Sequence, residues 1–142
     1  MIHKISVTGT GFADRNEIDE LNILWASMLA MERAIQELQS KLDRPIDAVL
    51  VDGNRLPNLK CPGYAIVKGD TKSVSIAAAS VVAKTVRDDF MSQMASLHPE
   101  YGWEKNMGYG TRQHLDALKK FGPTELHRQS FRPVFEALKS SY

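Results

Sequence analysis

The segment from residue 48 to residue 80 decides the fold. It contains two short apolar runs, AVLVDG at residues 48–53 and YAIVKGD at residues 64–70, followed by a run of small residues, SIAAAS, at residues 75–80. Four apolar residues between turn signals predict a buried strand, and the small residues predict a helix that packs closely on a sheet. Because ligands of open α/β sheets bind beyond the carboxyl ends of strands, we expect Asp52 and Asp70 at that edge.

Asp52 and Asp70 are candidate ligands for Mg²⁺ or Mn²⁺. Hard cations bind one or two protein carboxylates together with waters and substrate phosphates. Charge balance over two dications requires about four acidic ligands, so two carboxylates are few for a two-metal clamp. The same two side chains could instead cap the local turns beside Gly53 and Gly69, and their spacing leaves both interpretations open.

The composition is that of one ordinary globular domain. At 142 residues the chain is long enough for a real core, and its content of 43% hydrophobic and 25% charged residues is ordinary for a soluble globular protein. No stretch approaches the ~20 apolar residues of a membrane span, and no signal-peptide apolar region is evident near Met1. Cys61 is the only cysteine, which excludes an intrachain disulfide and predicts a reducing, cytoplasmic location.

Charge is distributed unevenly along the chain. Residues 1–53 hold 5 Lys/Arg and 9 Asp/Glu, whereas residues 54–142 hold 13 and 8. A basic half that also carries Tyr, Trp and His is compatible with a polyanionic partner, although charge alone favours a normally solvated surface.

The hydrophobic pattern predicts several helices and one further strand. A strand is expected from Ile2 to Thr8, and a long helix from an N-cap at Asn16 to a stop at Pro45. We expect that helix to bury a stripe formed by Leu21, Leu24, Trp25, Met28, Leu29, Met31, Ile35, Leu38 and Leu42. Further helices are predicted for residues 73–97, for residues 111–120 with Thr111 as N-cap, and from Pro133. Residues 98–111 are expected to form a loop.

Other polar and aromatic residues also suggest binding. Tyr109 stands between two glycines, which predicts an exposed ring that could stack on a sugar or base. The alternative is a loop tyrosine whose ring packs on the core. The segment HRQSFR at 127–132 offers two arginines and a hydroxyl for phosphate contacts, although composition alone favours a solvated segment before a helix. The segment KGDTKS at 68–73 lacks the glycine and Gly-Lys-Ser/Thr pattern of a phosphate loop. His98 and His114 have no metal-ligand spacing and are expected to be structural or surface residues.

The ordered motifs of the chain resemble those of ribonuclease HII, the type 2 ribonuclease H family. The resemblance extends over roughly residues 5–138. It is carried by EIDELNIL at 17–24, LAM at 29–31, VDGNRLP at 51–57, VKGD at 67–70, SIAAAS at 75–80 with AK at 83–84 and RD at 87–88, GYGT at 108–111, and HR at 127–128 with SF at 130–131.

The resemblance implies an RNase H-like α/β fold in which a sheet is flanked by helices. It implies one partial domain over residues 1–142, with a C-terminal helical substrate-binding segment. The expected activity is endonucleolytic cutting of RNA in RNA–DNA hybrids, and 5′ of single ribonucleotides in duplex DNA, with Mn²⁺ or Mg²⁺. Asp52 and Asp70 match two of the four catalytic, metal-binding acids. Tyr109 matches the tyrosine at the ribonucleotide–DNA junction, and Lys68, Lys84 and Arg128 would line the substrate groove.

The departures from the family pattern concern the N-terminal part. The strand with adjacent Asp-Glu, its Gly-Arg-Gly turn and the following Asp-Ser-Lys-Lys segment are absent, so the chain resembles an N-terminally truncated member. We therefore expect half of the metal ligands, an unpaired sheet edge beside Ile2–Thr8 that promotes self-association, and little or no activity. The acids at residues 14–20 lie at a helix start, which favours capping. Asn106-Met107 replaces a common His-Lys pair.

Two alternatives remain beside the truncated nuclease. One is a non-catalytic nucleic-acid-binding remnant of the same family, which would show salt-sensitive binding without cleavage. The other is an unrelated phosphate-binding α/β module that uses Lys68–Ser73, in which Lys68→Ala would abolish nucleotide binding and Asp52→Asn would not.

Overall fold

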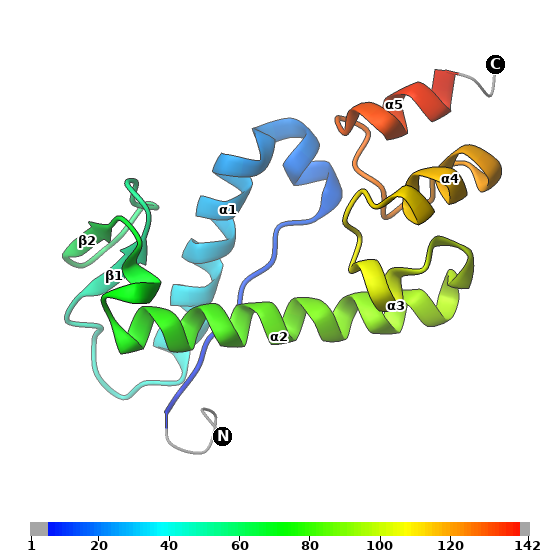
Figure 1. Cartoon of the computed structure of the whole chain (residues 1–142). Helices are drawn as coiled ribbons and strands as arrows, with labels where there is room; N and C mark the ends of the chain where they lie inside the picture. Colours follow the sequence, from blue (N-terminus) through cyan, green and yellow to red (C-terminus); the bar gives the residue numbers. More distant parts are fainter. Residues whose placement is uncertain (1–5, 140–142) are drawn as a thin grey trace. The chain divides into compact units, whose positions relative to one another are not determined.

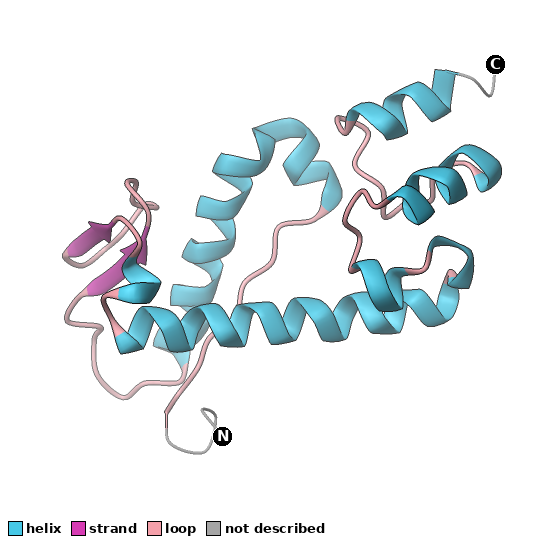
Figure 2. Cartoon of the chain, viewed as in Figure 1, coloured by secondary structure: helices cyan, strands magenta, loops and turns pink. Residues whose placement is uncertain are grey.

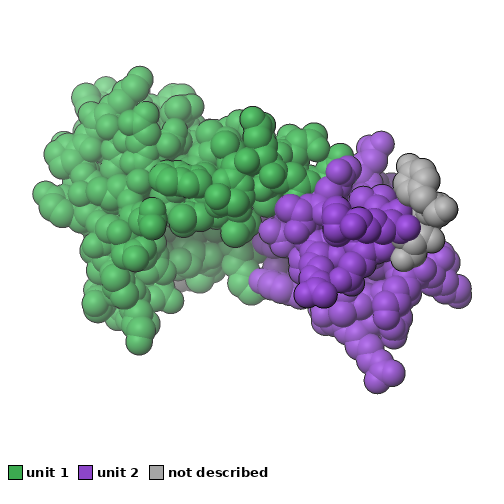
Figure 3. All heavy atoms as spheres, turned by 90° about the horizontal axis from the view of Figure 1, so that it is seen from above, with its two compact units in different colours: residues 1–84 green, residues 85–142 purple. Residues whose placement is uncertain are grey.

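The computed structural model describes residues 6–139 of the 142-residue chain. It contains two compact units, residues 1–84 and residues 85–142 (Figure 3), and the boundary between them falls within helix α2 (Val74–Leu97). The expected single-domain organisation stays a prediction. None of the helices within residues 6–139 combines the length and the apolar character that a membrane span requires.

Unit 1 contains the sheet. Its elements are α1 (Arg15–Ser40), β1 (Val49–Asp52), β2 (Gly63–Ile66), a 3₁₀ turn (Gly69–Thr71) and the first part of α2 (Figures 1 and 2). The two strands are parallel, with Val49 opposite Gly63 and Asp52 opposite Ile66. Both strands therefore end at the same edge, and the expected α/β class, with helices and a small parallel sheet, is confirmed.

Helix α1 begins two residues earlier than expected, at a different cap. Asp14, not Asn16, is the N-cap: its carboxylate accepts a hydrogen bond from the Glu17 amide (2.9 Å), and the Glu17 carboxylate accepts one from the Asp14 amide (2.9 Å). This reciprocal capping box satisfies two amides that an Asn16 cap would leave unpaired. The Glu17 carboxylate also accepts from Arg33, which together with the Asp14 amide lowers the pKa of Glu17 to about 2.

A break at Asn22 divides α1 into two helical segments. Asn22 has φ 67° and ψ 165°, a backbone conformation that a residue with a Cβ rarely adopts. Its side-chain oxygen accepts hydrogen bonds from the amides of Leu24 (3.0 Å) and Trp25 (3.4 Å). Asn22 is thus the N-cap of the second segment, and these bonds offset part of the backbone strain.

The expected burial of the α1 stripe is wrong at its N-terminal end. Leu21, Leu24 and Trp25 are 37%, 38% and 51% exposed, and only Ala26 and Met28 of this helix are buried. Helical periodicity shows which residues share a face, but it does not show whether another element covers that face. Elsewhere in unit 1 the buried apolar residues include Val51, Ile76 and Val82.

The segment before α1 is not a strand where the structure describes it. Residues 2–5 of the expected strand lie outside the described residues, and residues 6–8 have no strand pairing. Residues 8–12 instead run along α1, whose side chains bind their backbone: Lys41 Nζ donates to the Thr8 carbonyl (2.8 Å), Arg33 to the Phe12 carbonyl (2.6 Å), and Glu37 accepts from Thr10. These side chains thus form hydrogen bonds with backbone groups that a neighbouring strand would pair with in a sheet.

Unit 2 is helical. Beside the second part of α2 it contains a 3₁₀ turn (Pro99–Tyr101), α3 (Trp103–Asn106), α4 (Arg112–Phe121) and α5 (Arg132–Lys139). Residues 98–111, expected as a loop, thus include two short helical turns, because Tyr101 and Trp103 are drawn into the core. The N-cap at Thr111 is confirmed, since its side chain accepts from the His114 amide. The buried core consists of Met91, Ala95, Tyr101, Trp103, Ala117, Leu118 and Val134.

Aromatic rings and two histidines form the centre of the unit 2 core. The Tyr101 and Trp103 rings stack with centroids 5.0 Å apart, and the Tyr101 hydroxyl donates to the Gly122 carbonyl (2.6 Å). His114 and His127 are 5% and 7% exposed, and their Nε2 atoms lie 3.1 Å apart. The sequence left open whether His114 is a structural or a surface residue, and its burial shows that it is structural.

We expect Gly11→Ala to destabilise the chain. Gly11 does not have a positive φ, and at such a position an alanine would ordinarily stabilise the chain by roughly 0.4–1 kcal/mol. A Cβ at Gly11, however, would collide with the α1 backbone at Ala30 and Ala34. The expected net loss is about 1–3 kcal/mol, measured by urea denaturation. Gly110→Ala is the control, because its Cβ would lie at an ordinary 3.4 Å from Phe131. A Gly11→Ala chain as stable as the unmodified one would refute this close packing.

We expect stability to fall as the pH is lowered from about 6.5 towards 4. Burial, and then repulsion from His114, lower the pKa of His127 from 6.5 to about 4. Between these two pH values the unfolded chain binds a proton at His127 that the folded chain does not bind. The contribution of the neutral His127 to the free energy of unfolding is therefore fully present above pH 6.5. It falls as the pH is lowered, by on the order of 3 kcal/mol in total near pH 4. Unfolding measured from pH 7 to pH 5 should show this slope, and His127→Asn should flatten it; an equal slope in both chains would contradict the assignment.

Candidate functional site

Asp52 lies at the carboxyl end of β1 and binds the segment that follows β2. Its Oδ1 accepts a hydrogen bond from the Gly69 amide (2.8 Å), and the Gly53 amide donates to the Ile66 carbonyl (3.0 Å). Gly69 is buried, and a Cβ there would collide with the Ile76 side chain at the start of α2. The ends of the two strands are therefore joined tightly, with the Asp52 side chain as part of the junction.

Asp70 follows directly after the amide that Asp52 binds. It lies in the first turn of the Gly69–Thr71 3₁₀ turn, and its side chain is exposed. Asp52 is also exposed, although its strand neighbour Val51 is buried. The parallel strands thus bring two solvent-accessible carboxylate residues to one edge of the sheet, as the sequence predicts. The capping role considered for Asp52 is also present, because the same carboxylate binds the Gly69 amide.

Lys68 is held by its backbone in the turn before Asp70. It has a left-handed conformation (φ 55°), and its carbonyl accepts from the Thr71 hydroxyl (2.8 Å). The side chain is exposed, beside the carboxylate edge. Lys84 is also exposed and lies further along α2, as the last residue of unit 1.

The carboxylates fit part of a metal site. Within residues 6–139, no group of three or more His, Cys, Asp or Glu side chains is placed to hold a metal ion. Asp52 and Asp70 alone match the one or two carboxylates that bind a hydrated Mg²⁺, whose remaining positions are filled by waters and phosphates. They do not supply the four acids expected for a two-metal clamp.

Tyr109 lies on a tightly bound loop of unit 2. Its side chain is 68% exposed, as its flanking glycines predict. Its amide donates to the Asn106 carbonyl (2.8 Å), and its carbonyl accepts from the Thr111 amide (2.8 Å) and from His114 Nδ1 (2.9 Å). The backbone is therefore fixed while the ring is free to contact a ligand.

Arg128 is half-buried in the turn before α5. Its guanidinium lies over the Phe131 ring, 5.7 Å from the centroid, and its carbonyl accepts from the Phe131 amide (3.2 Å). The stack restrains the side chain and leaves guanidinium N–H groups available for phosphate. The candidates are thus divided: Asp52, Asp70, Lys68 and Lys84 belong to unit 1, and Tyr109 and Arg128 to unit 2.

Sequence reasoning missed two residues that hold the Tyr109 loop. Asn106 is buried; its amide group donates to the Tyr101 carbonyl (2.7 Å), and its oxygen accepts from the Gly108 amide (2.9 Å). His127 was expected only as part of a phosphate-binding or solvated segment, yet it is buried against His114. The bond between Asn106 and the Gly108 amide is a local Asx contact that the Asn-x-Gly spacing could have indicated. The burial of Asn106 and the pairing of His127 with His114 depend on the packing of unit 2 and have no signal in the sequence.

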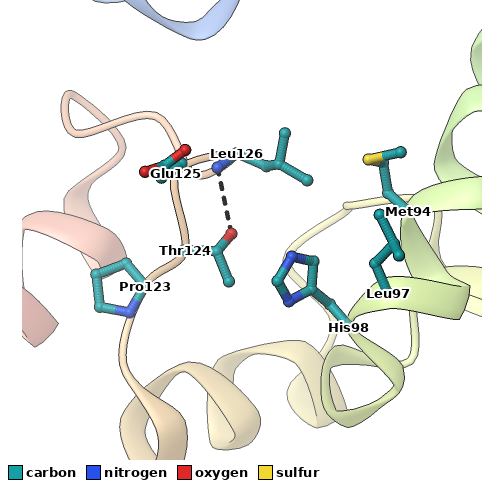
Figure 4. Close-up of a pocket in the computed structure, with 7 residues that line it drawn as sticks. All are labelled: Met94, Leu97, His98, Pro123, Thr124, Glu125 and Leu126. Carbon is teal, nitrogen blue, oxygen red and sulfur yellow. Dashed lines mark hydrogen bonds between the residues drawn. The ribbon is translucent and has the colours of Figure 1, made fainter.

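A pocket of about 540 Å³ lies elsewhere in unit 2 (Figure 4). It is lined by Met94, Leu97, His98, Pro123, Thr124, Glu125 and Leu126, and a hydrogen bond from the Leu126 amide to the Thr124 hydroxyl (3.2 Å) closes its turn. None of the candidate site residues lines this pocket.

Comparison with known proteins gives one consistent family. A family model described as Ribonuclease HII matches residues 1–135. The chain is 56% identical to Ribonuclease HII of Rhodospirillum rubrum over 94% of its own length and 59% of that relative. It is 48% identical to Ribonuclease HII of Zymomonas mobilis, over 94% of this chain and 62% of that relative. It is 49% identical to Ribonuclease HII of Polynucleobacter necessarius, over 99% of this chain and 71% of that relative.

The chain spans about six-tenths of the length of the first two of these relatives. Identity near 50% extends over nearly the whole chain, and the family model covers both the carboxylate edge and the Tyr109 loop. This chain therefore belongs to the ribonuclease HII family.

Proposed function

We propose that this chain carries two catalytic carboxylates and the nucleic-acid contacts of an endoribonuclease. Its substrates would be RNA–DNA hybrids and duplex DNA with embedded single ribonucleotides, cut 5′ of the ribonucleotide. The observation that carries the proposal is the hydrogen bond from the Gly69 amide to Asp52, because it places Asp70 at the same sheet edge as Asp52. Family membership supports the reaction class.

Asp52 and Asp70 are the proposed ligands for Mn²⁺ or Mg²⁺. When bound, such a cation supplies an activated water and stabilises the charge of the phosphodiester. One oxygen of Asp52 is used by the Gly69 amide, which fixes the carboxylate and leaves the second oxygen for a cation. Asp70 lies exposed on its turn and is available to the same cation or to its waters.

The remaining candidates are proposed to contact the nucleic acid. Lys68 and Lys84 carry exposed ammonium groups, and Arg128 has its guanidinium restrained by Phe131, so all three suit phosphate. Tyr109 presents an exposed ring on a fixed backbone, which suits stacking at the junction between ribonucleotide and DNA. The excess of Lys and Arg in residues 54–142 favours a polyanion.

We expect little or no cleavage by this chain alone. The described residues present two carboxylates where four are expected, and hydrolysis by a two-metal clamp requires both ions. We also propose a cytoplasmic location, in keeping with Cys61, a free thiol that is the only cysteine.

A non-catalytic nucleic-acid-binding remnant is the second candidate. It is favoured by the same shortage of carboxylates within residues 6–139. Family membership leaves no need for an unrelated phosphate-binding module built on Lys68–Ser73.

We expect Mn²⁺ to bind at the carboxylate edge. Added to the ¹⁵N-labelled chain, Mn²⁺ should broaden the amide signals of Gly53, Gly69 and Asp70 first. Asp70→Asn should weaken this binding at least about ten-fold, since a charged ligand is lost. The matched control is Asp47→Asn at the opposite end of β1, where the carboxylate forms an exposed pair with Arg44 (2.8 Å). First broadening elsewhere, or equal binding by Asp70→Asn, would refute the site.

Binding and cleavage of a duplex with one ribonucleotide test whether this chain acts as an enzyme or only binds nucleic acid. With Mn²⁺ or Mg²⁺, we expect the chain to bind this duplex, to lose affinity as salt rises, and to cleave it at or near background. Cleavage that Asp70→Asn abolishes and Asp47→Asn preserves would overturn our expectation of an incomplete site and establish an active enzyme. Folded protein that does not bind the duplex would contradict both candidates.

A further inference from the structure

Two buried histidines of unit 2 face each other beneath the Tyr109 loop. His114 lies in the first turn of α4 and His127 in the turn before α5, and their Nε2 atoms are 3.1 Å apart. Both rings are less than one-tenth exposed. A buried polar pair of this kind is stable only when every ring nitrogen has a partner of the right type.

Groups that can only donate fix the protons of both rings. The Thr124 amide donates to His127 Nδ1 (2.9 Å), so His127 carries its proton on Nε2. The Trp103 indole N–H donates to His114 Nε2 (3.3 Å), so that nitrogen also accepts from His127, and His114 carries its proton on Nδ1. Both rings are thus neutral, each with one defined tautomer.

The last donor of this chain of hydrogen bonds is directed at Tyr109. His114 Nδ1–H donates to the Tyr109 carbonyl (2.9 Å), which can only accept. The bonds therefore run in one direction, from the Thr124 amide through His127 and His114 to the loop that carries the exposed Tyr109 ring. Protonation or removal of either imidazole breaks this order.

We propose that His114, held in its tautomer by His127, is a positioning residue that orients Tyr109 for a nucleic-acid base or sugar. This inference rests on the proposed function, in which Tyr109 touches the substrate. Two apolar side chains in place of His114 and His127 could fill the same space. They would leave the Trp103 indole N–H and the Thr124 amide without hydrogen-bond acceptors. Burial and His114 lower the pKa of His127 to about 4, which keeps that ring neutral near pH 7.

The first test measures the tautomers in the unmodified chain. In ¹⁵N–¹H correlation spectra of labelled histidines at pH 7, we expect His114 protonated on Nδ1 and His127 protonated on Nε2. Any other tautomer, or a charged ring, would overturn the proposed chain of hydrogen bonds. This measurement needs no variant and therefore does not depend on whether a substituted chain folds.

The second test is a double-mutant cycle on the affinity for a duplex with one ribonucleotide. Tyr109→Ala should weaken binding about ten-fold, as expected for loss of one stacked ring. His114→Phe should weaken it about three- to ten-fold in the unmodified chain and by less than about two-fold in the Tyr109→Ala chain, because His114 acts through Tyr109. Equal effects in both backgrounds would show a merely structural role and refute the inference.

Two further variants complete the design. His114→Asn places an amide N–H near the position of Nδ1 and should restore much of the affinity that His114→Phe loses. His98→Phe is the matched control, because His98 also packs against Trp103 (centroids 5.5 Å apart) but lies outside the chain of hydrogen bonds. If Tyr109→Ala leaves binding unchanged, the proposed function fails at Tyr109. If only Tyr109→Ala weakens binding, the positioning role of His114 fails.

Discussion

The hydrogen bond between the Asp52 carboxylate and the Gly69 amide is the contact on which the candidate active edge depends. Each strand is only four residues long, and the Asp52 side chain continues the join between them beyond the last strand residues. The buried position of Gly69 against Ile76 brings the start of α2 to the same place. A polar side chain thus joins the segments that follow the two strands, at the edge where Asp70 is exposed.

In unit 2, by contrast, polar groups are buried in the core and each of them has a hydrogen-bond partner. Its core places two imidazoles, an indole N–H and a phenol among apolar side chains, and each has a partner of complementary type. Among the described residues, no buried side-chain nitrogen or oxygen lacks a partner. Such a network specifies one arrangement of its loops, since any other arrangement would leave a donor or acceptor unpaired in a low-dielectric core. That is why an exposed tyrosine can sit on a rigid backbone.

Helix α1 shows a local conflict that side chains resolve. The backbone at Asn22 has a positive φ, and the Asn22 side chain caps the segment that follows. The glycines at positions 9 and 11 allow the preceding segment to lie directly on the helix backbone. The charged residues Arg33, Glu37 and Lys41 then bind that segment, so one face of α1 acts as the hydrogen-bonding partner of an extended chain.

The sequence by itself determined what depends on neighbouring residues. The apolar run before Asp52, the cap at Thr111 and the exposed position of Tyr109 between glycines each follow from local chemistry, and the ordered motifs indicated the family. Only the tertiary structure decided the pairing of His114 with His127, the burial of Asn106, the exposure of Trp25 and the packing of Gly11 on α1. Those features join residues that lie far apart in the chain or depend on which element covers a face. A periodic pattern records which side chains point the same way, and it carries no information about what meets them.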